Sequence, residues 1–290
     1  MRAMRVHAGW ILLSLLPLLI LVMLVAVEVG ASGAGIGTLL HAPDVATRNL
    51  AWMVIAHIRA PRVVLAAMAG AALGAAGATM QGLFRNPLAD PGLIGVSSGA
   101  ALAASCVIVL GVDMAQSGFL NGWAVPLSGM LGSFLVTLLL YVFATRAGIT
   151  SVTTVLLAGV AFGAFSGALT GILIFRANDT ALRDLTFWTL GSFSGANWER
   201  IGLLSPFLVL AGVIATRLAV PLNAMLLGEA DAALMGYPVE RTKRLAMLGV
   251  AASVGPVVAF VGALGSVGVV VPTLVRLVTG PDHRLVLPGS

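Results

Sequence analysis

The chain has 290 residues, of which 59% are hydrophobic and only 9% are charged. Because such a composition leaves too little polar surface to cover a folded domain in water, it argues against a soluble protein. The formal charge of +5 comes from positive residues scattered between apolar segments, without a basic cluster that carries interleaved aromatics, so no nucleic-acid partner is expected.

The first predicted element is an apolar run from Trp10 to about Val29, which follows Arg2 and Arg5. Its length of nearly twenty residues suits a membrane span better than the roughly 7–15 apolar residues of a signal peptide. The small residues at 31–34 leave cleavage of a signal peptide open as the alternative. We favour an uncleaved first helix, with the N-terminus in the cytoplasm.

The second predicted span follows a stretch of mixed composition, His41–Ile58, which predicts an outer loop with a short helix. In total the apolar runs predict eight spans, at about Trp10–Val29, Val63–Gly82, Ile94–Val112, Leu127–Ala144, Val152–Phe175, Ile201–Val220, Leu245–Leu264 and Val267–Val278. The sequence therefore predicts an all-α polytopic membrane protein, with residues 1–290 in a single transmembrane domain. Alternation from a cytoplasmic N-terminus places Arg85, Arg146 and Arg244 in inner loops, as the positive-inside rule predicts.

Three glycines of the second span, Gly70, Gly74 and Gly77, recur at spacings of four and three residues. In a helix they share one face, and small residues there let a neighbouring backbone approach closely in lipid. We therefore assign these glycines to helix packing.

The stretch Met80–Ala100 is polar and interrupted, although apolar runs flank it on both sides. It contains Gln81 and the dipeptides Asn86-Pro87 and Asp90-Pro91. A helix cannot continue through these prolines, because each lacks an N–H and restricts the residue before it. Polar, broken backbone beside hydrocarbon persists only where protein or a water-filled cavity surrounds it. The stretch therefore predicts a turn on the working face of the protein.

The titratable residues do not indicate chemistry within this chain. Lys243 is the only lysine and no P-loop motif surrounds it, so ATP hydrolysis by that route is not expected. All eleven acidic residues fall in predicted loops or at span ends. This weakens an ion-coupled mechanism, since such carriers usually need an ionisable group inside the membrane. We expect no catalytic residues, no metal and no cofactor bound by this chain.

Three polar segments remain as candidate sites, and each has a plain structural alternative. Gly228–Gly236, in the most polar inner loop, predicts one or two helical turns with alanines on a flat face, or simply a solvated loop. Gly148–Ser151 predicts a glycine turn whose hydroxyl groups cap the next helix. Arg59 and Arg62 lie at the outer mouth of the second span, where arginines also snorkel to the interface.

Together with Arg59–Arg62, the stretch Met80–Ala100 resembles the permease subunits of ABC importers for ferric siderophores, haem and cobalamin, the FecCD-type family. Gly262–Arg276 and Gly280–Arg284 match a second stretch of that family. Ser266 and Thr273 depart from its pattern with a loss of ring volume that would alter local packing. The resemblance implies a BtuC-like bundle of ten spans, of which about eight are present and the last two would be lacking.

For the inner side, the resemblance implies a cytoplasmic coupling loop at residues 223–244 that inserts into the ATPase subunit. The residues that it assigns to this contact are Glu229, Ala230, Ala232 and Gly236, with Glu229 bonded to an arginine of the partner. Thr150 and Ser151 would form the cytoplasmic gate of the translocation path at a dimer axis.

For the outer side, the resemblance implies that Arg59 and Arg62 contact acidic residues of a periplasmic substrate-binding protein. Ala60 stands where the family usually has leucine, which leaves both charges in place. The outer loop Phe175–Ser192 contains the text LRDLTFWTLGS, which looks most like haem-transporting members, although its aromatic residues also suit an interfacial belt.

We therefore predict the permease subunit of an ATP-binding-cassette importer that translocates an iron-containing chelate, haem first, across the bacterial inner membrane. Its partners would be a second copy in a homodimer, two ATP-binding subunits that carry ATP and Mg, a periplasmic binding protein and the lipid bilayer. A ferric-siderophore or cobalamin permease is the alternative within the family. An ion-coupled secondary carrier or channel is the alternative of another class.

Overall fold

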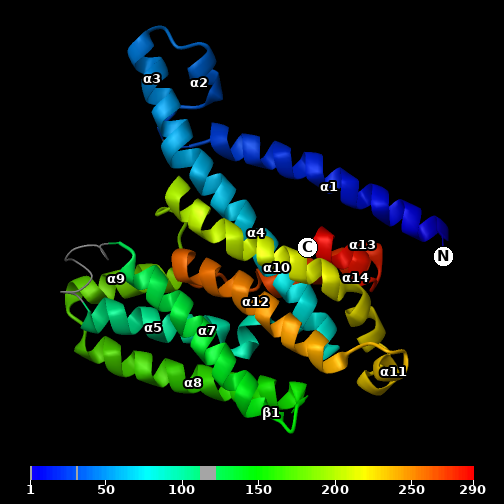
Figure 1. The fold of residues 1–290 in the computed structure, drawn as a ribbon. Coiled ribbons are helices and arrows are strands. Elements are labelled where there is room, and N and C mark those ends of the chain that lie inside the picture. Colours follow the sequence, from blue (N-terminus) through cyan, green and yellow to red (C-terminus); the bar gives the residue numbers. More distant parts are fainter. Residues whose placement is uncertain (1, 31, 112–121) are drawn as a thin grey trace.

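The computed structural model describes residues 2–30, 32–111 and 122–290, with side chains from residue 13 onward. The fold is a helical bundle with one short hairpin (Figure 1). Its elements are α1 (Arg2–Glu28), α2 (Ile36–Leu40), α3 (Val45–Val54), η1 (Ile55–Arg59), α4 (Ala60–Phe84), η2 (Pro91–Ile94), α5 (Val96–Leu110), α7 (Ala124–Ala144), β1 (Thr145–Arg146), β2 (Ile149–Thr150), α8 (Val152–Arg176), α9 (Asp179–Leu190), α10 (Trp198–Met225), α11 (Glu229–Leu234), α12 (Val239–Val261), α13 (Val267–Thr279) and α14 (His283–Gly289).

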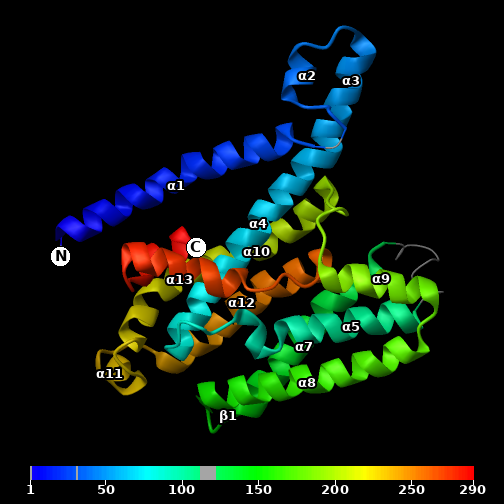
Figure 2. The same cartoon turned by 180° about the vertical axis from the view of Figure 1, so that it is seen from behind.

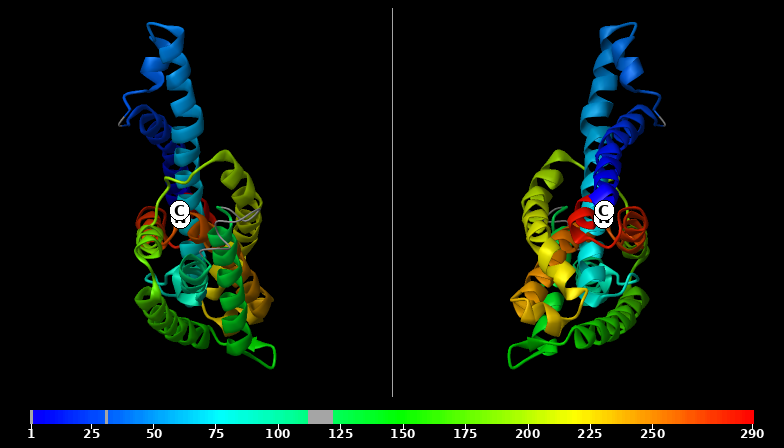
Figure 3. Two further views of the ribbon diagram at one scale, coloured as in Figure 1. Left: turned by 90° about the vertical axis from the view of Figure 1, so that its left-hand side faces the viewer. Right: turned by 90° about the vertical axis from the view of Figure 1, so that its right-hand side faces the viewer.

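The central helix of the bundle is α4, against which α10, α12 and α13 pack. Through its other side α12 contacts α5 and α7, which pack on each other, and α8 lies against α5. Seen from behind, α1 runs along one flank of this assembly, on the side of α13 (Figure 2). The views at right angles show α3 and the start of α4 projecting beyond the rest of the bundle (Figure 3).

Five helical segments have the length and apolar composition to cross a membrane: Val45–Phe84, α7, α8, α10 and α12. Three shorter apolar helices, Leu13–Glu28, α5 and α13, occupy the other predicted spans. The all-α, multi-span class is thus confirmed, whereas α5 and α13 are shorter than a full span. The predicted end of the third span at Val112 lies outside the described residues.

The stretch His41–Ile58, predicted as an outer loop with a short helix, does contain a helix, but this helix is continuous with the second span from Val45 to Phe84 and is not separated from it by a loop. A π-helical turn, η1, ends two residues before Pro61, and in such a turn the carbonyl of Ala56 would accept the amide N–H of residue 61. Proline has no N–H to donate. The indole Nε1 of Trp198 donates to that carbonyl instead, at 2.8 Å. The wider turn and this contact let the helix continue through Pro61, although the sequence predicts that the span begins only at about Val63.

The outer loop before the sixth predicted span contains a helix of its own, α9. Asn178 caps it, since its side-chain oxygen accepts the backbone N–H of Ala181 at 2.8 Å. Ala181 and Leu185 are buried, whereas Phe187 is exposed. This segment is therefore a packed element, with part of its aromatic surface directed outward.

Helix α12 is the most enclosed of the long helices, with 78% of its most apolar segment buried, whereas the corresponding figure for α8 is 11%. The interior around α12 consists of small and aliphatic side chains from α4, α10 and α12 itself. Large apolar residues remain exposed on the outer faces of α7, α8 and α10. Such faces suit hydrocarbon or a partner subunit rather than water.

Two of the three glycines assigned to helix packing lie at close backbone contacts. A methyl group at Gly77 would overlap the carbonyl of Gly268 in α13, and one at Gly74 would overlap the carbonyl of Ser290. Gly70 faces open space instead. The structure therefore places Gly74 and Gly77, but not Gly70, at the contacts that the sequence pattern predicts.

Candidate functional site at the polar end of the bundle

The C-terminus of α4 and three short elements, η2, the β1–β2 hairpin and α11, lie at one end of the bundle, which we call the polar end (Figure 1). All three short elements contact α12. The sequence predictions for the interrupted stretch, the coupling loop and the gate all fall there. Their residues are thus brought together around the start of one buried helix.

The turn after α4 is built by side chains that satisfy their own local backbone. Arg85 ends the helix in the left-handed region, with φ of 51°. The side-chain oxygen of Asn86 accepts the amide of Leu88 at 2.9 Å, and Asp90 accepts the amide of Gly92 at 2.7 Å, which caps η2. The chain thus reverses here without exposing unpaired turn amides, as the two Asx-Pro dipeptides predict.

Gln81 is fully buried and joins α4 to α13. Its amide nitrogen donates to the carbonyl of Val269 at 3.1 Å and to the hydroxyl of Thr273 at 3.3 Å. Thr273, one of the two departures from the family pattern, thus supplies an acceptor for this buried amide. Ser266, the other departure, precedes α13 in the left-handed region, with φ of 63°, which is unusual for a residue other than glycine.

The predicted coupling loop is shorter than residues 223–244, because α10 continues to Met225 and α12 begins at Val239. Gly228 and Gly236 bracket α11 with φ of 134° and 86°, values that favour glycine. Ala230 is exposed, but Ala232 is fully buried in the core. Of the three alanines in this segment, Ala230 and Ala233 are exposed, whereas Ala232 points into the chain's own interior and cannot belong to a flat docking face.

Glu229 does not extend freely toward a partner, because it forms a salt bridge with Lys243 at 2.7 Å. Lys243 also pairs with Glu240 at 2.9 Å and donates to the carbonyl of Thr150 at 2.7 Å. In the sequence, Lys243 argues against a P-loop and adds to the positive charge of the inner loops, and no role is predicted for Glu240. A lone lysine three residues after a glutamate, at the start of an apolar helix, was the available signal.

The gate candidates lie in the corner between the hairpin and α8. Thr150 is buried, and its hydroxyl bonds that of Thr145 across the hairpin at 3.0 Å. The hydroxyl of Ser151 accepts the amide of Thr154 at 3.2 Å, so Ser151 caps α8 as predicted. Gly148, at φ of 79°, takes part in the reversal between the two strands. Both residues of the corner are thus engaged in hydrogen bonds.

The prediction that Arg59 is presented to a docking partner is wrong. Its side chain is directed inward, and the residue is only 8% exposed. The guanidinium group donates to the carbonyls of Val27 and Glu28, each at 2.7 Å, and to the hydroxyl of Ser32 at 3.0 Å. These carbonyls belong to the C-terminal turn of α1, where a cation is favourable. Arg62 is exposed and remains the candidate for docking.

A second buried polar cluster at the polar end was not predicted. The Nδ1 atom of His283 donates to the side-chain oxygen of Asn223 at 2.9 Å, and Nε2 accepts from Arg276 at 3.3 Å. Burial, together with the charge of Arg276, lowers the pKa of His283 from 6.5 to about 4. The ring is therefore neutral at pH 7, in the tautomer that these two bonds require. The cluster joins α10, α13 and α14.

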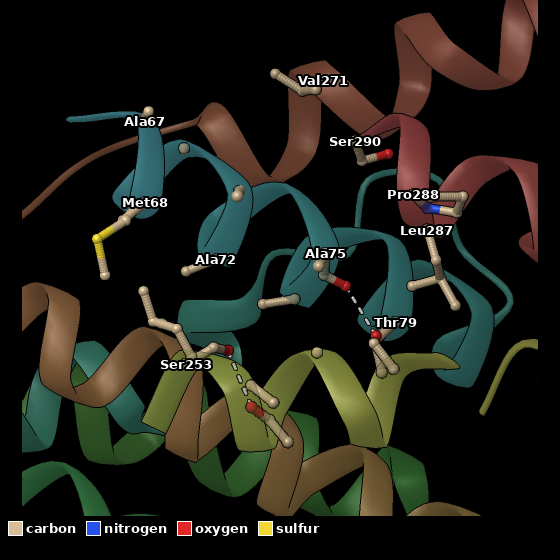
Figure 4. Close-up of a pocket in the computed structure, with 18 of the residues that line it drawn as sticks. Ala67, Met68, Ala72, Ala75, Thr79, Ser253, Val271, Leu287, Pro288 and Ser290 are labelled. Carbon is tan, nitrogen blue, oxygen red and sulfur yellow. Dashed lines mark hydrogen bonds between the residues drawn. The ribbon is translucent and has the colours of Figure 1, made fainter. Parts of the chain in front are cut away.

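A cavity of about 900 Å³ opens beside Gly70, between α1 and the α4–α10–α12 core. Figure 4 shows residues of α4, α12, α13 and α14 that line it. Apolar side chains line most of it, and no charged side chain does. The hydroxyl groups of Thr79 and Ser253 already donate to carbonyls of their own helices, at 2.8 and 2.9 Å. The side chains that line the cavity thus include no charged group, and these two hydroxyls are already engaged. Within the described residues, no cluster of His, Cys, Asp or Glu could hold a metal ion.

Comparison with known proteins gives consistent matches. The profile of the FecCD transport family matches residues 17–290. The chain is 35% identical to the hemin transport system permease protein HmuU of Yersinia pestis over 286 residues, which are 99% of this chain and 84% of that protein. It is 38% identical to the cobalamin import system permease protein BtuC of Halobacterium salinarum over 83% of this chain and 63% of that protein. It is 39% identical to the vitamin B12 import system permease protein BtuC of Salmonella typhi, over 80% of this chain and 69% of that protein.

A solved structure described as an inward-facing metal-chelate type ABC transporter has the same fold. Its TM-score with this chain is 0.84 at 27% sequence identity, over 97% of this chain and 85% of the other.

Proposed function

This chain belongs to the FecCD transport family, and we propose that it is the permease subunit of an importer that carries haem across the inner membrane of a bacterium. The resemblance found in the interrupted stretch is thereby confirmed at the level of the family. As an ABC permease of this family, the chain transports and does not catalyse, and ATP hydrolysis belongs to a separate subunit. An ion-coupled secondary carrier is no longer the alternative.

Support for haem comes from the extent of the match to the hemin permease, which includes 99% of this chain. The cobalamin permeases are slightly more identical, at 38–39%, but over 80–83% of the chain. A cobalamin permease is therefore the second candidate. The sequence LRDLTFWTLGS, which begins in α9 and ends two residues after it, favours haem over cobalamin, as the family resemblance implies.

In the proposed mechanism, two copies of the chain form a path between them, with the N-termini in the cytoplasm. The segment Gly228–Gly236, which we call the coupling segment, contacts an ATPase subunit through exposed residues such as Ala230 and Leu234, the latter 87% exposed. The corner at Thr150 and Ser151 closes the cytoplasmic end of the path. Arg62 contacts a periplasmic binding protein at the opposite end. The partners bias an equilibrium between outward-open and inward-open states.

The test is uptake by the chain assembled with its ATPase and binding protein in proteoliposomes. We expect haem uptake that requires ATP on the ATPase side and continues when ionophores abolish the ion gradients. A complex whose ATPase lacks the P-loop lysine is the matched control, because it keeps the assembly and removes hydrolysis. Uptake of cobalamin in place of haem would select the second candidate, and gradient-driven uptake without ATPase would contradict both.

A further inference from the structure

The side chain of Lys243 is 2% exposed, although Lys243 lies in the second turn of α12 at the polar end. Its ammonium group donates to Glu229 Oε2 at 2.7 Å, to Glu240 Oε1 at 2.9 Å and to the carbonyl oxygen of Thr150 at 2.7 Å. An ammonium group has three N–H donors, so all of them are used. The position of Lys243 is therefore fixed relative to each of its three acceptors.

The three acceptors belong to three different elements. Glu229 begins α11, Glu240 lies in the first turn of α12, and Thr150 ends β2 directly before the start of α8. The second carboxylate oxygen of Glu240 accepts the amide N–H of Thr150 at 2.8 Å. Both backbone polar groups of Thr150 are thus held by side chains of α12. A single nitrogen atom connects the start of the coupling segment to the gate corner.

Burial is unequal among these charges. The side chains of Glu229 and Glu240 are 39% and 34% exposed, whereas that of Lys243 is 2% exposed. Removal of the ammonium group would therefore leave two carboxylates that water can reach, and no buried unpaired charge. Removal of one partner of a buried ion pair is costly chiefly when the charge that remains is buried and unpaired, and neither carboxylate is fully buried here. We therefore expect the fold to tolerate the loss of the ammonium group.

We propose that Lys243 is a positioning residue that transmits movement of the coupling segment to the Thr150–Ser151 corner. This inference rests on the proposed function, which assigns the coupling and gating roles to these two segments. When an ATPase subunit displaces the coupling segment, Glu229 moves the ammonium group of Lys243. Thr150 follows, because its carbonyl accepts a hydrogen bond from the same nitrogen. Coupling between two sites is carried by contiguous contacts of this kind.

The test compares Lys243→Met with Lys243→Arg in the complex with ATPase subunits and binding protein. Methionine keeps an unbranched side chain without the donors, whereas arginine keeps a cation and several donors. The native cysteine, Cys106, is replaced by serine, and a cysteine is placed at Ile149, which is 67% exposed in the hairpin. Three quantities are measured: ATPase rate, ATP-driven uptake, and the change in maleimide labelling at position 149 when ATP and vanadate are added.

We expect the Lys243→Met complex to assemble and hydrolyse ATP, with uptake per ATP and the nucleotide-dependent change in labelling each reduced about tenfold. Lys243→Arg should restore both. An ATPase-competent Lys243→Met complex that keeps its uptake and its labelling change would overturn the proposal. A parallel loss of assembly, hydrolysis and uptake would overturn it as well, since the network would then only hold the fold.

Glu240→Gln provides an independent check, because it keeps the length of the side chain and weakens the bonds to Lys243 and Thr150. We expect retained ATPase activity with a reduced labelling change at position 149, and an unaltered change would contradict the proposal. Absence of ATP-driven uptake in the parent complex, with Lys243 intact, would instead contradict the proposed function itself. The two failures are therefore distinguishable.

Discussion

Substitution of Arg59 by methionine separates an anchoring role from a docking role at the outer end. The guanidinium group donates three hydrogen bonds to Val27, Glu28 and Ser32, and methionine keeps much of the volume without the donors. Hydrogen bonds that involve a charged group contribute about 1.5–3 kcal/mol each. Because bonds from one side chain are not independent, we take about 3 kcal/mol for the combined loss. For a chain of this size, that loss lowers the melting temperature by about 6–12 °C.

The assay is thermal unfolding of the purified chain in detergent, together with titration of the binding protein below the melting temperature. Arg59→Met should lower the melting temperature and leave the affinity for the binding protein unchanged. Arg62→Met is the matched control, because it removes the same charge from an exposed side chain. It should weaken a salt-dependent association and leave the melting temperature unchanged. A stable Arg59→Met protein with weakened association would refute the assignment of Arg59 to α1.

Three further outcomes are expected. The pKa of His283, about 4 in the folded protein, lies below its ordinary value of 6.5, so its contribution to stability is complete above pH 6.5 and is lost as the pH falls toward 4. Melting temperatures measured across that range should fall, and His283→Gln should flatten the dependence. Gly77→Ala should destabilise the chain by about 1–3 kcal/mol through overlap with a backbone carbonyl, whereas Gly70→Ala, which meets open space, should not; equal melting temperatures would contradict this packing. Glu229→Ala should reduce ATP-driven uptake about tenfold and leave the melting temperature unchanged. The control Glu199→Ala, at the other end of the bundle, should change neither quantity. Unchanged uptake by Glu229→Ala would count against a role in coupling.

Much of the fold could be predicted from the sequence, because the bilayer imposes a length and a composition on every spanning segment. Apolar runs located each long helix, and the two Asx-Pro dipeptides located the end of α4. The prediction failed between His41–Ile58 and the second span, where the helix is partly amphipathic and continues through Pro61. There the deciding contact comes from Trp198, which is 142 residues away from its acceptor Ala56. Local patterns carry no information about such a contact.

Less of the candidate site could be predicted from the sequence. The family resemblance indicates which positions matter, but not whether their side chains point to the surface or to the interior. Ala232 matched the coupling pattern, yet its side chain points into the core. Arg59 matched the docking pattern, yet its partners lie 27 to 32 residues earlier in the chain. Lys243 lies in a polar loop of the predicted topology, yet its side chain is buried. In each case the direction of the side chain depends on packing between helices.

The π-helical turn at Ile55–Arg59 has a geometric consequence for the outer end of the molecule. An α-helix turns by about 100° per residue, so one additional residue within a turn rotates everything beyond it by that amount relative to a regular helix. One additional residue in this turn therefore sets the direction in which α3 points around the helix axis. The hydrogen bond from the Trp198 indole to Ala56 stabilises the turn. Neither α3 nor α4 needs to change its own sequence for the projection to face another direction.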